Sequence, residues 1–139
     1  MATSRWQSLM FTAALTLAFP AALAAQEAAG LTSDPAQAKK GQSLWNSRGC
    51  TGCHSIGHGK RSGPDLAGVF ERRELAWLRR WLKNPTQMLE TDSVAQALLA
   101  QYNNTKMPNL RLSDADIESL LQFIAAESEK HRQQQAGSQ

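Results

Sequence analysis

The sequence predicts an all-α fold of about four helices around a long glycine-rich loop. Apolar residues recur at helical spacing in four segments, and most of these segments begin beside a residue that caps helices. No segment alternates apolar and polar residues as a half-buried strand does. The segment Gly52–Gly68 holds five glycines and a proline, and a loop this long needs something in the domain to pack against it.

The first 24 residues are predicted to be a secretory signal peptide. Arg5 gives the start a positive charge, Leu9–Phe19 is an apolar run, and Ala22-Leu23-Ala24 is typical of a cleavage site. The apolar run is short for a membrane span, although an uncleaved anchor is the alternative. Export predicts an oxidising compartment, here the periplasm.

The remaining chain is expected to form one domain of residues 34–127, after a flexible linker of residues 25–33. The formal net charge is +3, and removal of residues 1–24 takes away one positive charge, that of Arg5. A charge this small does not predict a nucleic-acid partner. No later segment is apolar enough to cross a membrane, so no membrane association is expected once the signal peptide is removed.

The first predicted helix begins at Asp34-Pro35. Asp34 is a typical N-cap, and a proline at the first helical position loses no hydrogen bond. Gly41 and Trp45 recur at helical spacing on the face expected to point inward. The helix is expected to end near Arg48-Gly49.

The second helix is expected over about Arg73–Lys83, ended by Pro85. It carries Trp77 and Trp81 four residues apart on one face. We interpret both as core or pocket walls rather than as an electron relay. The basic residues of this region are interpreted as solvated or paired with acidic groups of a ligand, with a docking face as the alternative.

A third helix is expected from Asp92-Ser93 to Asn103-Asn104, with Val94, Ala97, Leu98 and Tyr102 on one side. The segment that follows is expected to be extended, because Pro108 biases the residue before it away from helical geometry.

The last predicted helix begins at Ser113, a typical N-cap. Its apolar residues follow the spacing of one helical face: Ile117, Leu120, Leu121 and Ile124. After Glu127 the chain is polar without periodicity, and residues 128–139 are expected to form a frayed tail.

Both cysteines lie in the run Cys50-Thr51-Gly52-Cys53-His54. A structural zinc site needs four ligands, and only His58 and His131 are available to complete one. A thioredoxin-like redox pair belongs in a βαβ setting, which is missing from the predicted elements. A disulfide across so short a gap would stabilise little.

The remaining interpretation is covalent attachment of one c-type haem, for which Cys-x-x-Cys-His is the signature. Cys50 and Cys53 would form the thioethers, and His54 would be the proximal iron ligand. For the sixth ligand we favour Met107, because the following proline stiffens its backbone. His58, which is close to His54 in sequence, and Met88, which is typical of core filler, are the alternatives.

The sequence resembles the small monohaem class I c-type cytochromes of bacteria. The resemblance spans about Asp34–Ala126 and is carried by residues at these positions: Gly41, Trp45, Cys50-Thr51-Gly52-Cys53-His54, Gly63-Pro64-Asp65-Leu66, Met107-Pro108, Leu112-Ser113, Ile117, Leu120, Phe123 and Ile124. It implies a cytochrome c fold, with helices wrapped around one haem and the first and last helices crossing.

The resemblance also implies two supporting contacts beside the haem. The Pro64 carbonyl would accept a hydrogen bond from the His54 ring, which orients the ring and raises its basicity. Asn109 would brace the Met107 segment.

The function expected from these observations is single-electron transfer between respiratory redox proteins, such as a terminal oxidase or a respiratory reductase. The protein is expected to be a monomer and not an enzyme. The alternative is a haem enzyme or sensor, such as a peroxidase, with a displaceable sixth ligand.

Overall fold

The computed structural model describes Leu31 and residues 34–138 of the chain. These residues form α2 (Pro35–Ser47), the 3-10 turn η1 (Cys50–Gly52), α3 (Val69–Arg72), α4 (Leu75–Lys83), α5 (Pro85–Thr91), α6 (Ser93–Gln101) and α7 (Asp114–Ala136). The all-α prediction is confirmed, since the only β contact among the described residues is an isolated bridge between Ser55 and Asp65. The predicted signal peptide and nearly all of the predicted linker lie outside the described residues.

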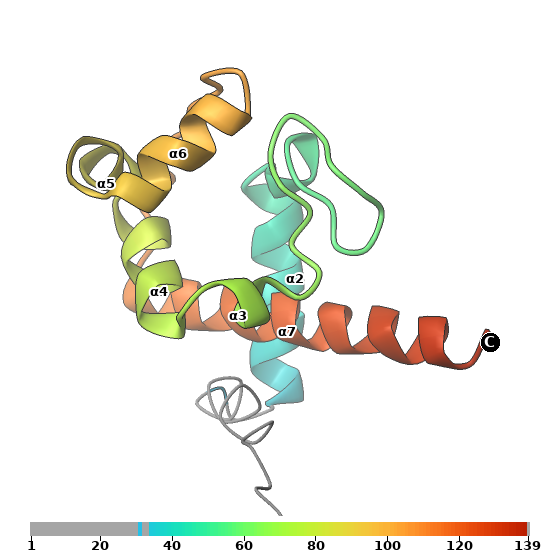
Figure 1. The fold of residues 1–139 in the computed structure, drawn as a ribbon. Helices are drawn as coiled ribbons and strands as arrows, with labels where there is room; N and C mark the ends of the chain where they lie inside the picture. Colours follow the sequence, from blue (N-terminus) through green and yellow to red (C-terminus); the bar gives the residue numbers. More distant parts are fainter. Residues whose placement is uncertain (1–30, 32–33, 139) are drawn as a thin grey trace, which may run out of the picture.

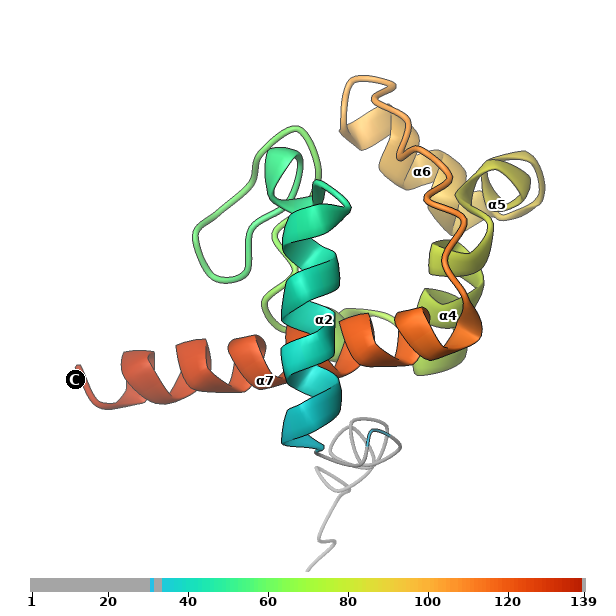
Figure 2. The ribbon, with the colours of Figure 1, turned by 180° about the vertical axis from the view of Figure 1, so that it is seen from behind.

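Helices α2 and α7 cross at the centre of the molecule (Figures 1 and 2). The side chain of Asp34 caps α2 by accepting hydrogen bonds from the backbone N–H groups of Ala36 and Gln37. At the crossing, a Cβ atom on Gly41 would lie 2.0 Å from the backbone oxygen of Ser119. A glycine is therefore what lets the two backbones approach where the first and last helices cross.

The apolar face of α7 forms much of the core. Ser113 caps the helix by accepting a hydrogen bond from Asp116 N–H at 3.2 Å. The four residues expected to point inward from α7 are all at most 5% exposed: Ile117, Leu120, Leu121 and Ile124. Trp45 of α2 packs against Phe123 of α7, with ring centroids 5.8 Å apart.

The frayed tail expected after residue 127 is wrong, because α7 continues to Ala136. Its polar turns are held by pairs three and four residues apart, such as Arg132 and Gln133 with Glu129. The His131 ring also lies against Gly57, where an added Cβ would be 2.4 Å from its Nδ1. The last turns of α7 therefore contact the loop that follows Cys53.

The segment between the loop and α7 holds two short helices that were not predicted, α3 and α5. Helix α5 begins at Pro85, with Asn84 accepting a hydrogen bond from Gln87 N–H. Helix α4 begins at Leu75, two residues later than expected, because Arg73 has extended backbone geometry.

Helix α6 begins and ends as predicted, and two of the four residues expected on one side, Leu98 and Tyr102, are half-buried, but its fully buried residue is not among the four. It begins beside Asp92, and the chain turns after it through Asn103 and Asn104, with φ of 54° and 57°. Ala95 is fully buried, whereas Val94 is 38% exposed. No helix among the described residues is long and apolar enough to cross a membrane.

Candidate functional site

The loop after η1 fixes the orientation of the His54 ring. The ring Nδ1 lies 2.9 Å from the Pro64 carbonyl oxygen, and a carbonyl only accepts, so Nδ1 carries the proton and Nε2 is left to act as a ligand. A Cβ on Gly63 would lie 2.6 Å from the ring Cε1, so the absence of a side chain there makes room for the imidazole. Burial lowers the pKa of His54, which favours the neutral, ligating form.

The Asp65 carboxylate holds the same loop closed. It accepts hydrogen bonds from the backbone N–H groups of Gly57 and Ala67, both at 2.8 Å, and from the Ser55 hydroxyl at 3.1 Å. Burial opposes the charged form, but these bonds and one from Gly59 N–H outweigh it and lower the pKa of Asp65 to about 2. The carboxylate is therefore ionised at neutral pH.

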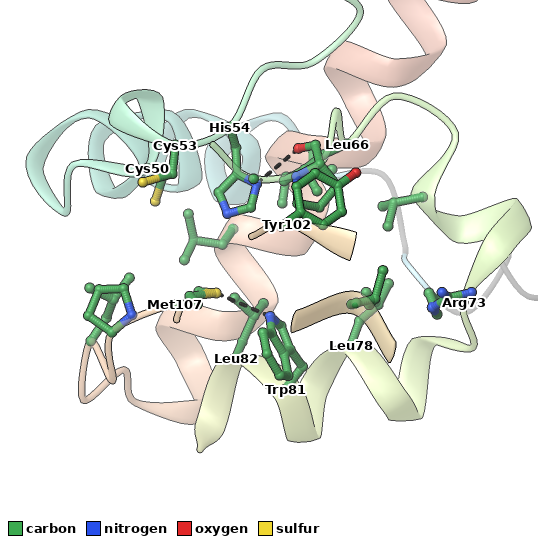
Figure 3. Close-up of a pocket in the computed structure, with 18 of the residues that line it drawn as sticks. Cys50, Cys53, His54, Leu66, Arg73, Leu78, Trp81, Leu82, Tyr102 and Met107 are labelled. Carbon is green, nitrogen blue, oxygen red and sulfur yellow. Dashed lines mark hydrogen bonds between the residues drawn. The ribbon is translucent and has the colours of Figure 1, made fainter. Parts of the chain in front are cut away.

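Cys50 and Cys53 lie beside His54 as free thiols. The 3-10 turn brings the two positions together, since Cys53 N–H donates to the Cys50 carbonyl at 3.1 Å. Figure 3 shows both sulfur atoms at one end of the pocket into which His54 points. Burial raises the pKa of Cys50. Among the described residues no group of three or more His, Cys, Asp or Glu side chains could hold a metal ion, which gives the zinc interpretation no support.

Met107 lies across the pocket from His54, on the other wall (Figure 3). Its sulfur accepts a hydrogen bond from the Trp81 indole N–H at 3.1 Å. The Asn109 side chain braces this segment, because it donates to Asn84 Oδ1 at 3.3 Å and accepts from Arg111 N–H at 2.9 Å.

The other two candidate sixth ligands do not line this pocket. Met88 is 6% exposed and belongs to the hydrophobic core. His58 is exposed and lies near His131, with ring centroids 6.4 Å apart. The structure therefore brings together His54, Pro64, Met107 and both cysteines, and keeps His58 and Met88 apart from them.

Apolar side chains from several elements line the rest of the pocket. They include Leu66, Val69, Leu78, Leu82, Leu98, Leu110, Leu120, Leu121 and Ile124. Trp77 and Trp81 both line it as well, as expected of pocket walls. Arg48, Arg72 and Arg73 are the arginines of the lining.

These residues fit a haem. The walls are apolar, as a porphyrin requires, two free thiols lie at one end, and an imidazole nitrogen and a thioether sulfur lie on opposite walls. One wall contributes His54 from the loop and the other contributes Met107, so both ligand types known for cytochromes c are available.

Sequence reasoning found the motif residues but missed the role of Trp81 as a hydrogen-bond donor to Met107. The two residues are 26 positions apart, and no periodicity links them. The only signal was the partly buried indole itself on α4, since an indole N–H usually finds a hydrogen-bond partner.

Comparisons with known proteins agree with this geometry. Over 91 residues the chain is 30% identical to one of the subunits of nitric oxide reductase from Stutzerimonas stutzeri, an alignment of 61% of this chain. The chain spans about half (54%) of the length of that curated relative.

Solved structures with the same fold include a cytochrome c from Rhodothermus marinus, with a TM-score of 0.66 and 28% identity over 71% of this chain and 83% of the other. The cytochrome c domain of the pp3183 protein from Pseudomonas putida has a TM-score of 0.58 and 40% identity, over 65% of this chain and 89% of the other. An engineered Rhodothermus marinus cytochrome c bound to a carbene intermediate has a TM-score of 0.62 and 25% identity, over 76% and 98% of the two chains.

The cytochrome c family model matches residues 38–127, which include the two cysteines, His54 and Met107. With the Cys-x-x-Cys-His motif in place at the pocket, the haem is covalent and of the c type. The chain belongs to the cytochrome c family and serves haem-based electron transfer, with one haem c attached through Cys50 and Cys53.

Proposed function

We propose that this protein is a periplasmic single-electron carrier whose haem iron is ligated by His54 and Met107. The observation that carries the proposal is the position of these two side chains on opposite walls of one pocket (Figure 3). Haem supplies a one-electron couple between Fe(III) and Fe(II). With both axial positions occupied, no substrate has to bind the iron, and methionine–histidine ligation favours a raised potential.

Two properties of the pocket residues support an electron carrier: they fix the orientation of His54, and they surround the haem with apolar side chains. The Pro64 carbonyl keeps Nε2 of His54 directed into the pocket, which limits reorganisation between oxidation states. The apolar lining excludes water from the ligand side chains. Partners would meet such a protein briefly, through a small interface.

The proposed partners are respiratory redox proteins, with a terminal oxidase or a respiratory reductase as the two classes. The likeness to one of the subunits of nitric oxide reductase supports the reductase. Periplasmic location rests on the sequence of residues 1–24, and mass spectrometry of the exported protein would test it. A chain beginning at Ala25 is expected.

A redox titration with optical spectra, made on the purified holoprotein, tests the carrier function. We expect a single reversible one-electron wave and the weak methionine-to-iron band near the red end of the ferric spectrum. Met107→Ala should abolish this band, lower the potential and let the ferrous protein bind carbon monoxide. Met88→Ala is the matched control, because it removes a buried methionine outside the pocket and should leave the band in place.

A haem enzyme or sensor with a displaceable sixth ligand is the competing function. The engineered neighbour that holds a carbene intermediate is a reason to test it directly. Rapid, stoichiometric carbon monoxide binding by the wild-type ferrous protein would favour that function and contradict the carrier.

A further inference from the structure

We propose that His58 and His131 form a binding site for a divalent transition-metal ion, with Cu²⁺ as the preferred metal. The chain has three histidines, and His54 belongs to the haem pocket. The fold brings the other two together from segments far apart in the chain, with ring centroids 6.4 Å apart. Imidazole nitrogen is a ligand of copper, nickel and zinc, and Cu²⁺ is bound most tightly in that series.

The backbone on both sides of His58 is fixed by the loop that carries His54. The Asp65 carboxylate accepts hydrogen bonds from the N–H groups of Gly57, at 2.8 Å, and of Gly59. The His58 side chain itself is exposed. Its ring can therefore turn toward a metal ion while its backbone stays in place.

His131 comes from the part of α7 that lies beyond the segment matched by the family model. Its ring packs on Gly57, where an added Cβ would lie 2.4 Å from Nδ1. Nδ1 thus faces the loop backbone, and Nε2 lies on the other side of the ring, 3.0 Å from the Gln135 amide nitrogen. The Ser128 hydroxyl lies 3.4 Å from the Leu66 carbonyl oxygen. This part of α7 therefore rests on the same loop that positions the other histidine.

The separation of the two rings fits a single metal ion. A metal bound to an imidazole nitrogen at about 2.0–2.1 Å lies about 3.2 Å from the ring centroid, so two rings on one ion have centroids at most about 6.4 Å apart. The observed separation equals that limit, and a turn of the exposed His58 ring shortens it. Two imidazole nitrogens, completed by water oxygens, are the mixed N,O set that Cu²⁺ accepts in tetragonal geometry.

The charged side chains beside His131 are paired with one another. Lys130 lies 3.6 Å from the Glu127 carboxylate, and Arg132 Nε donates to Glu129 at 2.9 Å. The positive charges on this stretch of α7 are thus balanced and do not repel a cation. A bound metal ion would link the end of α7 to the loop and stabilise the folded protein by mass action.

The test is calorimetric titration of the ferric holoprotein with Cu²⁺, and separately with Zn²⁺, at a pH of about 7.5, where histidine is ordinarily neutral. In the holoprotein both cysteine sulfurs are bound to haem, so they do not compete for copper. We expect one Cu²⁺ per chain, bound more tightly than Zn²⁺.

Two substitutions locate the site. His58→Gln and His131→Gln should each weaken Cu²⁺ binding by at least about tenfold, since even loss of a group that supports a ligand costs about 10–100-fold. The double variant should bind no more weakly than the weaker single variant, because both ligands serve one ion. Gln134→Ala, an exposed change on the same helix, is the control and should bind as wild type does.

Equal Cu²⁺ affinity of wild type and either histidine variant would overturn the inference, because the metal would then be an adventitious ion bound elsewhere. Absence of Cu²⁺ binding to wild type would overturn it as well. The result does not depend on the proposed ligation by His54 and Met107, and the ferric haem spectrum should stay unchanged through the titration.

Wild-type protein answers the same question if a variant does not fold. Diethyl pyrocarbonate modifies accessible imidazole nitrogens, and His58 is exposed. Saturating Cu²⁺ should slow its modification by at least about tenfold, as measured by mass spectrometry of the peptides. Modification of Lys60, an exposed amine on the same loop, is the internal control and should not change. An unchanged rate at His58 would contradict the proposal.

Discussion

At the scale of single residues, the Asp65 carboxylate stabilises the loop that carries His54. Its bonds to Gly57, Ala67 and Ser55 are charge-assisted on the acceptor side. We expect Asp65→Asn to lower the free energy of unfolding of the holoprotein by about 1–3 kcal/mol at pH 7. Denaturant titration at several pH values would measure the loss.

The difference in the free energy of unfolding between wild type and Asp65→Asn should depend on pH in one direction. The folded-state pKa of Asp65 is about 2, below its ordinary value of 3.8, so the folded protein binds the proton less readily than the unfolded chain. Its contribution is complete above pH 4 and is lost as pH falls toward 2. The difference between wild type and Asp65→Asn should shrink over that range. Asp114→Asn, at an exposed ion pair, is the control, and parallel pH curves for wild type and Asp65→Asn would contradict the prediction.

The sequence was sufficient to identify the site residues that lie close together in the chain. Cys50, Cys53 and His54 share one five-residue motif, whose spacing reflects the chemistry directly. Met107 followed from a short choice among methionines and histidines, helped by the adjacent proline. The Trp81 contact could not be predicted, because it depends on how α4 packs against a segment 26 residues later.

At the scale of helices, the crossing of α2 and α7 depends on Gly41. Alanine there would place its Cβ 2.0 Å from Ser119 O and 2.7 Å from Phe123 Cβ. The gain in helix propensity from glycine to alanine is about 1 kcal/mol, less than the cost of separating the backbones. We expect Gly41→Ala to destabilise the holoprotein by about 2–3 kcal/mol, measured by denaturant titration.

Gly137→Ala is the matched control for the crossing. At that position the new Cβ would meet only ordinary contacts, the nearest at 3.6 Å, and the backbone has ordinary helical φ. Its effect should stay within about 0.5 kcal/mol. If Gly41→Ala were as stable as this control, the close approach of the two helices would not depend on the glycine.

Helix prediction succeeded where capping and periodicity agreed. The caps at Asp34, Asp92 and Ser113 each accept the expected backbone hydrogen bonds. Helix α5 was missed although Asn84-Pro85 repeats the signal of Asp34-Pro35, because the proline was interpreted only as the end of α4. The last turns of α7 were missed because local polar pairs hold them, and such pairs leave no apolar period.

At the scale of the whole molecule, the domain is small and its centre is a haem pocket. The apolar side chains around that pocket have few protein atoms to pack against on their inner side, so haem burial stabilises the fold. We expect the double substitution of Cys50→Ser and Cys53→Ser to yield protein without covalent haem and without a cooperative unfolding transition. Near-UV circular dichroism and thermal denaturation would measure this.

Thr51→Ser is the control for the double substitution, since it changes an exposed residue of the same motif and keeps both thiols. It should fold with haem attached. A haem-free double variant that unfolds cooperatively would show that the polypeptide forms its core alone, contrary to the prediction.

The long α7 has a practical consequence for measurements on electrodes. Its last turns carry the carboxyl end of the described chain to the side of α2 opposite α4 (Figures 1 and 2), away from the Met107 wall. A linker or dye attached beyond Ala136 therefore leaves that wall uncovered. Molecules tethered to an electrode through this end can still exchange electrons with soluble proteins.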